Sequence, residues 1–230
     1  MKFNALLYIA LLVLVFQSCG VRKFDPNLQN ALFSADYKPN TEGKICTQGY
    51  YLPYDINCNK FRSGRGFCLS DNGMITYGIL FAYMYPMDSL STNKLDEFID
   101  NGNFDFNYSD NHTGKTYGGI YKVSGDTLIT DCYYIINSTF LDNWGLKTTR
   151  YKIIDNETLI EIPTSSDRKD KLRYEFCGPR GYRFVPATKL PGEFISSVRD
   201  PKWMWKNEED WRAYKKARDE YKKSLWQQTP

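Results

Sequence analysis

Short segments that alternate apolar and polar residues, joined by very short polar turns, constrain this chain more than any other feature. From Ile75 to Tyr83 every second residue is apolar, and Phe104–Tyr108 and Leu172–Phe176 alternate in the same way. Successive side chains of a strand point to opposite faces, so this pattern is typical of strands with one buried face. Strands therefore dominate the predicted fold.

The alternating segments follow one another closely, which predicts how they pair. Ser124–Thr127 and Asp155–Glu157 separate neighbouring segments and consist mainly of turn-forming residues. Consecutive strands joined by tight turns pair antiparallel, and eight or so of them close on themselves to hide their edges. The predicted fold is all-β, an antiparallel up-and-down barrel or half-barrel, with further strands at Tyr117–Val123, Leu128–Ile136, Leu146–Ile154, Thr158–Ile162 and Tyr182–Val185.

Two segments have helical character instead. Ser91–Asn101 is a polar segment that predicts a short helix between strands. Near the C-terminus, Asn207 is a suitable N-cap, and three acidic residues follow it where the helix dipole favours negative charge. A helix over about 208–226 would carry one amphipathic stripe, formed by Trp211, Tyr214, Ala217, Tyr221 and Leu225, opposite a lysine-rich face.

The N-terminus has the composition of a targeting signal. Lys2 precedes the apolar run Ala5–Phe16, which is too short to span a bilayer comfortably. The small residue Ser18 directly before Cys19 resembles the bacterial lipoprotein signal, in which the cysteine is lipidated and becomes the new N-terminus. Several acyl chains on Cys19 would anchor the protein stably. The alternative is an ordinary cleaved signal peptide in which Cys19 is incidental.

This organisation divides the chain into four parts. We expect a signal peptide over 1–18, a lipidated tether over 19–43, a barrel domain over 44–190 and a C-terminal extension with the amphipathic helix over 191–230. The tether has no clean periodicity, and at most one helical turn is expected in it, near Leu28–Phe33.

Five cysteines remain when Cys19 is assigned to lipid, so at least one of them is unpaired. Cys46, Cys58 and Cys68 are close in sequence, and export to an oxidising compartment favours one local disulfide among them. Cys132 falls inside a predicted strand, where a small apolar packing role is expected. The cysteine spacings, which extend to Cys177, lack the paired pattern of zinc sites.

The segments Gly119–Leu128 and Tyr151–Ile160, with Tyr133, Tyr134 and Trp144 between them, resemble a lipocalin-like family of Bacteroidetes lipoproteins. Members of that family repeat a Tyr-x-x-x-Gly-Asp-Thr-Leu and Tyr-x-Ile-x-Asp-x-x-Leu texture on successive barrel strands. The resemblance covers about 117–185. It implies a calycin-type barrel. No acidic run, which would resemble the surface-export tag of Bacteroidetes lipoproteins, follows Cys19, so the periplasmic face of the outer membrane is slightly favoured over the cell surface.

Little in the sequence indicates catalysis or nucleic-acid binding. A net charge of +3 is too small to indicate a nucleic-acid partner. The single histidine, His112, lies among turn-forming residues and is expected in a solvated loop. Arg62–Gly66 has the glycines and arginines of an anion nest but lacks a P-loop ending, so an exposed loop is favoured. We therefore expect no enzyme, no metal and no cofactor.

Tyrosines of common parity provide the candidate binding residues. Alternation directs them into the barrel, where they would line a cavity for a small hydrophobic or aromatic ligand, or would simply fill a solid core. The alternative function is an envelope scaffold that binds a protein or glycan through its outer surface. The candidate ligand-lining residues are Tyr77, Tyr121, Tyr134, Tyr151 and Tyr174.

Overall fold

The fold is that of a computed structural model of the full chain. It describes residues 31–39, 41, 43–57, 60–62, 64–80, 95–97, 99, 104–105, 118–137, 143–163, 180–190 and 199–228. The predicted strand at Leu172–Phe176, the N-terminal signal with Cys19, and His112 lie outside the described residues.

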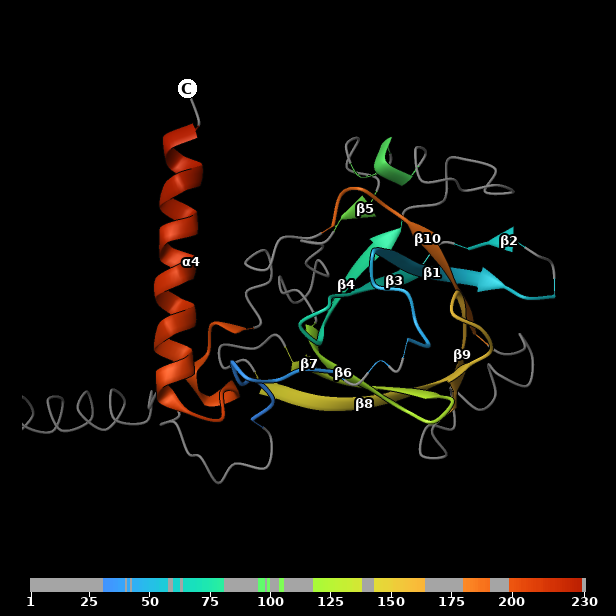
Figure 1. The fold of residues 1–230 in the computed structure, drawn as a ribbon, viewed down its shortest axis with the longest axis horizontal. Coiled ribbons are helices and arrows are strands. Elements are labelled where there is room, and N and C mark those ends of the chain that lie inside the picture. Colours follow the sequence, from blue (N-terminus) through green and yellow to red (C-terminus); the bar gives the residue numbers. More distant parts are fainter. Residues whose placement is uncertain are drawn as a thin grey trace, which may run out of the picture.

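Eight antiparallel strands form a closed barrel, and Figure 1 shows the strands surrounding a common interior. Each strand of the ring pairs with the next, and β10 pairs back with β1, with Tyr51 opposite Phe184. The ring consists of β1 (Gly49–Asp55), β3 (Gly64–Leu69), β4 (Met74–Leu80), β6 (Gly118–Ser124), β7 (Thr127–Asn137), β8 (Asn143–Ile153), β9 (Thr158–Ile162) and β10 (Gly181–Pro186).

Three smaller elements and one long helix accompany the ring. Strand β2 (Lys60–Phe61) extends the β1 pairing, and β5 (Phe104–Asp105) pairs with the end of β4. A 3₁₀ turn, η3 (Lys202–Met204), precedes α4 (Glu208–Gln228), which stands beside the barrel in Figure 1. The all-β barrel with up-and-down strand order and a C-terminal helix, predicted from the sequence, is confirmed.

The alternation of the sequence determines which side chains lie inside. On β4, Ile75 and Tyr77 belong to the interior cluster, as their parity predicted. Cross-strand register maintains this face around the ring, because a strand that slipped by one residue would turn all its apolar side chains outward. The buried interior cluster comprises Ile45, Tyr51, Phe67, Leu69, Ile75, Tyr121, Val123, Leu128, Cys132, Tyr151, Leu159, Tyr182 and Phe184.

Strands β1 and β3 are not among the individually predicted strands. The outer faces of these strands are also covered, because Tyr50, Leu52 and Cys68 lie in a cluster with Leu95 and Val185. With both faces buried, β1 shows no polar–apolar alternation, which removes the sequence signal. Residues 64–66 begin β3, so the exposed loop expected at Arg62–Gly66 is wrong there.

The predicted helix at Ser91–Asn101 is helical at residues 95–97 and 99, the part of it that the structure describes. Asp96 connects this segment by hydrogen bonds to the residues that follow β10. Its carboxylate accepts hydrogen bonds from the Thr188 hydroxyl at 2.6 Å and the Thr188 amide at 3.1 Å. These bonds hold the pKa of Asp96 below its usual value. Leu95, the neighbouring residue, packs against the outer wall of the barrel.

A second outer cluster joins α4 to the barrel wall. Phe33 and Trp205 form an isolated parallel bridge, and both pack with Tyr133 of β7 and Tyr214 of α4. The Leu32 amide donates to the Tyr133 hydroxyl at 3.1 Å. The chain is therefore packed at Leu32 and Phe33, where the sequence predicted a tether with a helical turn.

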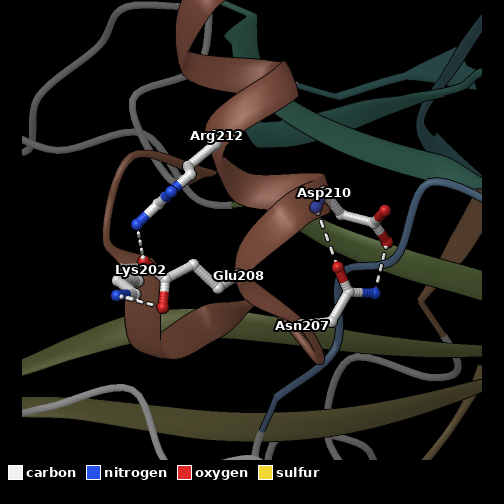
Figure 2. A network of polar contacts seen from close by, with 5 residues as sticks. All are labelled: Lys202, Asn207, Glu208, Asp210 and Arg212. Carbon is white, nitrogen blue, oxygen red and sulfur yellow. Dashed lines mark hydrogen bonds and ion pairs between the residues drawn. The ribbon is translucent and has the colours of Figure 1, made fainter.

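The first turn of α4 carries the cap that the sequence predicted, and Figure 2 shows it. The Asp210 amide donates to Oδ1 of Asn207 at 2.8 Å, and Asn207 Nδ2 donates to Oδ2 of Asp210 at 2.8 Å. Beside it, hydrogen bonds from Lys202 and Arg212 lower the pKa of Glu208. Together these contacts fix the point where the helix begins.

Among the described residues, Cys46, Cys68 and Cys132 are free thiols. The predicted local disulfide among Cys46, Cys58 and Cys68 is therefore wrong. Cys68 is buried on the outer wall of the barrel, whereas Cys46 packs against the interior cluster, so the barrel wall separates the two thiols. Cys132 is buried in the interior as a small apolar residue, as predicted.

Candidate functional site

The two ends of the barrel differ in the length of their connections. At one end, which we name the turn end, residues 70–73, 125–126 and 154–157 join consecutive strands of the ring. At the opposite end, the loop end, the connections between ring strands span residues 56–63, 81–117, 138–142 and 163–180. Binding residues concentrate on long loops and in barrel mouths, so the loop end is the candidate entrance.

The segment that precedes β1 closes the turn end. Lys44 Nζ donates to the Gly125 carbonyl at 2.9 Å, and Ile45 is buried in the interior cluster. The Cys46 amide and the Tyr51 hydroxyl both hydrogen-bond to the Asn156 carbonyl, at 3.3 and 3.0 Å. Residues 44–46 therefore occupy the turn end, and among the described residues the loop end is the candidate entrance.

Aromatic rings fill the middle of the barrel and form a floor for any site above them. Phe67 lies at the centre of this floor, fully buried. Its ring centroid is 5.4 Å from that of Tyr51, 5.7 Å from Tyr77, 5.3 Å from Tyr151 and 5.2 Å from Tyr182. Stacked and tilted pairs at these separations stabilise one another beyond simple burial. A binding site inside the barrel would therefore lie on the loop-end side of these rings.

Hydroxyl groups interrupt the apolar floor. Tyr77 and Tyr151 approach with their hydroxyl oxygens 3.4 Å apart, and Sγ of Cys132 lies 4.0 Å from the Tyr77 oxygen. Burial raises the pKa of both tyrosines well above the ordinary value, and it raises the pKa of the Cys132 thiol to about 12. All three groups are protonated at neutral pH. They can orient a ligand by hydrogen bonding, but the thiol is not poised as a nucleophile.

Charged side chains lie between this floor and the loop end. Glu161, which faces Tyr151 across the β8–β9 pair, accepts a hydrogen bond from the Tyr182 hydroxyl at 3.4 Å. Arg180 lies 3.7 Å from the same carboxylate oxygen. Arg65 and Lys147 have the parity of interior residues but are exposed, because they lie beyond the packed rings. We call the region between the packed rings and the loop end the rim. It combines three cations, Arg65, Lys147 and Arg180, with the largely buried carboxylate of Glu161.

The structure brings together only part of the predicted set of tyrosines. Tyr77 and Tyr151 meet in the barrel centre, whereas Tyr121 lies toward the turn end and donates to the Ser70 carbonyl at 2.9 Å. For Tyr134 the structure describes the backbone alone, opposite Gly145, and Tyr174 is outside the described residues. Their places in the site remain predictions.

Sequence reasoning missed Phe67, Tyr182 and Glu161 as site residues. Tyr182 lay in a predicted strand, but the parity of a residue within its own strand does not show which residue of another strand it contacts, and its contact with Glu161 was therefore missed. Phe67 had no signal, because its strand reads Gly-Arg-Gly-Phe-Cys-Leu and has no clean alternation. The central position of such a residue can be recognised only from the closed barrel, in which its contacts with distant strands are present.

A hollow of about 300 Å³ lies outside the barrel between α4 and the β4–β6 wall. The small residues Ala213 and Ala217 of α4 leave room there, and Trp205 and Tyr214 form aromatic walls. Arg199 lies over both rings, at 5.0 and 4.5 Å from their centroids. Of the predicted helix stripe, Tyr214 is buried and Trp211 and Tyr221 are half-buried, so these rings do not form an exposed aromatic patch.

Neither a metal site nor a spanning helix is found in the described part of the chain. No three His, Cys, Asp or Glu side chains gather there as a metal-binding group. No helix in this part is long and apolar enough to cross a bilayer.

The protein belongs by its fold to the closed antiparallel β-barrels, with one long C-terminal helix added. The strand order around the ring, the closed turn end and the packed aromatic rings inside define this class. Comparison of the chain with protein-family models, with curated proteins and with solved structures finds no match.

Proposed function

We propose that this protein is a membrane-anchored, non-catalytic lipoprotein that binds a small hydrophobic or aromatic ligand in the loop-end half of the barrel. The observation that carries the proposal is the polar cluster of Tyr77, Tyr151, Tyr182 and Glu161 on a floor of packed rings. Small-molecule sites are apolar hollows with a few convergent polar groups, and the mouths of barrels are favoured places for them. The resemblance of 117–185 to lipocalin-like lipoproteins supports the same function.

The first test is native mass spectrometry of residues 20–230, a version that retains every described residue. A bound ligand adds a reproducible mass that is lost on denaturation, and that mass identifies the class of ligand. The neutral fluorophore N-phenyl-1-naphthylamine is the probe for a titration, with one saturable site expected. A clean unliganded mass together with no saturable fluorescence contradicts the proposal.

A steric substitution at the rim makes the site location testable. Lys147 has interior parity and is exposed, so Lys147→Trp places a ring across the loop end without disturbing the packed floor. We expect at least about a ten-fold loss of probe affinity, the equivalent of roughly 1.4 kcal/mol. Lys152→Trp is the matched control, because it lies on the same strand with the opposite parity. Equal affinity in the two variants places the site elsewhere.

The anchoring part of the proposal rests on Cys19. In cells fed with labelled palmitate, we expect the wild-type chain to incorporate label and to fractionate with membranes. Cys19→Ala should abolish both, while Cys46→Ala, which removes a cysteine of the folded part, should change neither. Label retained in Cys19→Ala contradicts lipidation at this residue.

A further inference from the structure

Within the part of the chain that the structure describes, one outer face of the barrel belongs to neither of the outer clusters described above. The outer cluster with Leu95 covers β1, β3 and β10, and the cluster with Trp205 and α4 covers β4, β6 and the loop-end part of β7. The turn-end half of the outer face across β6–β9 belongs to neither cluster. Its side chains are therefore available to a partner.

Cations and isoleucines alternate across this face from strand to strand. In one row, Lys122 lies opposite Ile129, Ile129 opposite Arg150, and Arg150 opposite Ile162. In the next row, Lys152 lies opposite Ile160. Directly opposed residues of neighbouring strands have Cβ atoms about 4.5–5.5 Å apart, so the face is one continuous surface. We name it the basic isoleucine face and define it by Lys122, Arg150, Lys152, Ile154, Ile160 and Ile162.

The exposure of its apolar members is unusual. Ile154 is 49 % exposed and Ile162 is 39 % exposed. Ile56, the remaining exposed large hydrophobic residue in the described part of the chain, packs beside Gly181, which is opposite Ile160. Exposed aliphatic side chains that gather on one side of a protein mark an interaction surface.

Charge complementarity selects the occupant. Lys122, Arg150 and Lys152 are exposed, and Asp131, an acid on the same outer face, accepts a hydrogen bond from the Thr148 hydroxyl at 2.5 Å. The other acids nearby lie at the edge, in the turns at 125–126 and 154–157. A second copy of the chain would oppose cations to cations, which is unfavourable. An anionic surface with an apolar layer beneath it satisfies both kinds of side chain.

We propose that the basic isoleucine face docks on a bilayer surface that carries anionic headgroups. The lysines and the arginine contact the headgroups, while Ile154 and Ile162 enter the apolar boundary just below them. The inference rests in part on the proposed lipid anchor, because the described structure begins at Ala31 and the next residue, Leu32, is hydrogen-bonded to Tyr133 of β7 next to this face. Residues 20–31 reach at most about 40 Å from Cys19, so the anchor would hold the face within range of the bilayer.

Co-sedimentation with vesicles tests the proposal without the anchor. Residues 20–230 are mixed with phosphatidylcholine vesicles, with or without phosphatidylglycerol as a minor component. We expect binding to the anionic vesicles alone, weakened by added salt. The triple variant Lys122→Gln, Arg150→Gln, Lys152→Gln should lose about 100-fold in affinity, since each cation contributes independently near an anionic surface. Ile154→Ser with Ile162→Ser should also bind more weakly at high salt, where insertion dominates.

The control carries the same charge change on α4, as Lys216→Gln, Lys222→Gln and Lys223→Gln, and should bind like the wild type. Thermal melts confirm that each variant is folded. Absence of wild-type binding, or an equal loss in the α4 control, overturns the proposal. So does capture of an acidic protein by cross-linkers at Lys122 and Lys152 when vesicles do not bind. Probe binding inside the barrel should be unchanged in all these variants, so failure here and failure of the proposed function are distinguishable.

Discussion

At the scale of single residues, Gly119 is a position where the sequence and the barrel depend on each other. It lies on β6 opposite Cys132, and a Cβ added there would be 2.7 Å from the Cys132 Cα and would overlap the Asp131 carbonyl. The close approach of β6 and β7 therefore requires glycine at this position.

We predict that Gly119→Ala destabilises the protein by about 3 kcal/mol or more, because the two strands must move apart to admit the methyl group. Urea unfolding followed by tryptophan fluorescence measures the change. Ser124→Ala, on the same strand with an exposed side chain, should remain within about 0.5 kcal/mol of the wild type. An unchanged midpoint for Gly119→Ala would show that the β6–β7 pair tolerates the extra volume.

The candidate site was predictable residue by residue only where alternation was clean. Tyr77 has Ile75 and Ile79 at the same parity, so its inward direction followed from the sequence. Its contact with Tyr151, 74 residues away in the sequence, did not, because no local pattern determines which inward side chains meet across a barrel. Phe67, the centre of the floor, had no alternating neighbours at all.

At the scale of elements, α4 is the best example of local determination. Its cap, its acidic first turn and its stripe all lie in one stretch of sequence, and the helix begins at Glu208 as they predict. The cap also serves the tertiary fold, because Oδ2 of Asp210 accepts a hydrogen bond from the Ala35 amide at 2.8 Å.

Removal of the cap should weaken the helix without abolishing the fold. We predict that Asn207→Ala costs about 1 kcal/mol, since the amide of Asp210 loses its side-chain acceptor. Asn207→Ser should restore most of that stability because serine caps equally well. Circular dichroism during urea unfolding reads out both variants. If the alanine and serine variants unfold alike, the cap contributes nothing measurable.

The strands show the limit of local determination. β4 was found because the face with Ile75 and Tyr77 is apolar and the other face is not. β1 was not predicted individually because its seven residues are all buried or nearly so. The segment near Leu95 covers the outer face of β1, so that face carries apolar residues and the strand shows no alternation. An element that is buried on both sides is determined by its neighbours in space.

At the scale of the whole molecule, the protein core, both inside the barrel and on its covered outer wall, is rich in buried hydroxyl and thiol groups that resist ionisation. Burial raises the pKa of Tyr50, Tyr51, Tyr77, Tyr121, Tyr133 and Tyr151, and it raises the pKa of Cys68 and Cys132 to about 12. In the unfolded chain the tyrosines ionise near pH 10, roughly their ordinary value. Above that pH the unfolded state releases protons that the folded state retains.

We therefore predict a cooperative alkaline transition. The stabilising contribution of each raised pKa is complete below the unfolded value and is lost as pH rises through the folded value, by about 1.4 kcal/mol per pH unit for each group. Tyrosinate absorbance should show exposed tyrosines that ionise gradually near pH 10, followed by a steep step that coincides with loss of near-ultraviolet circular dichroism. A single gradual titration with the fold intact would mean that the interior hydroxyls are accessible to solvent.

The sequence by itself determined the class of secondary structure, the parity of most strands, the antiparallel order imposed by short turns, and the C-terminal helix with its cap. Each of these depends on residues within about ten positions of one another, where periodicity and turn chemistry act. The tertiary structure alone decided that β10 returns to β1, that Cys46 and Cys68 lie on opposite sides of a wall, and that Phe67 joins four tyrosines. These are contacts between distant residues, and only closure of the ring, which buries every strand edge at once, selects them.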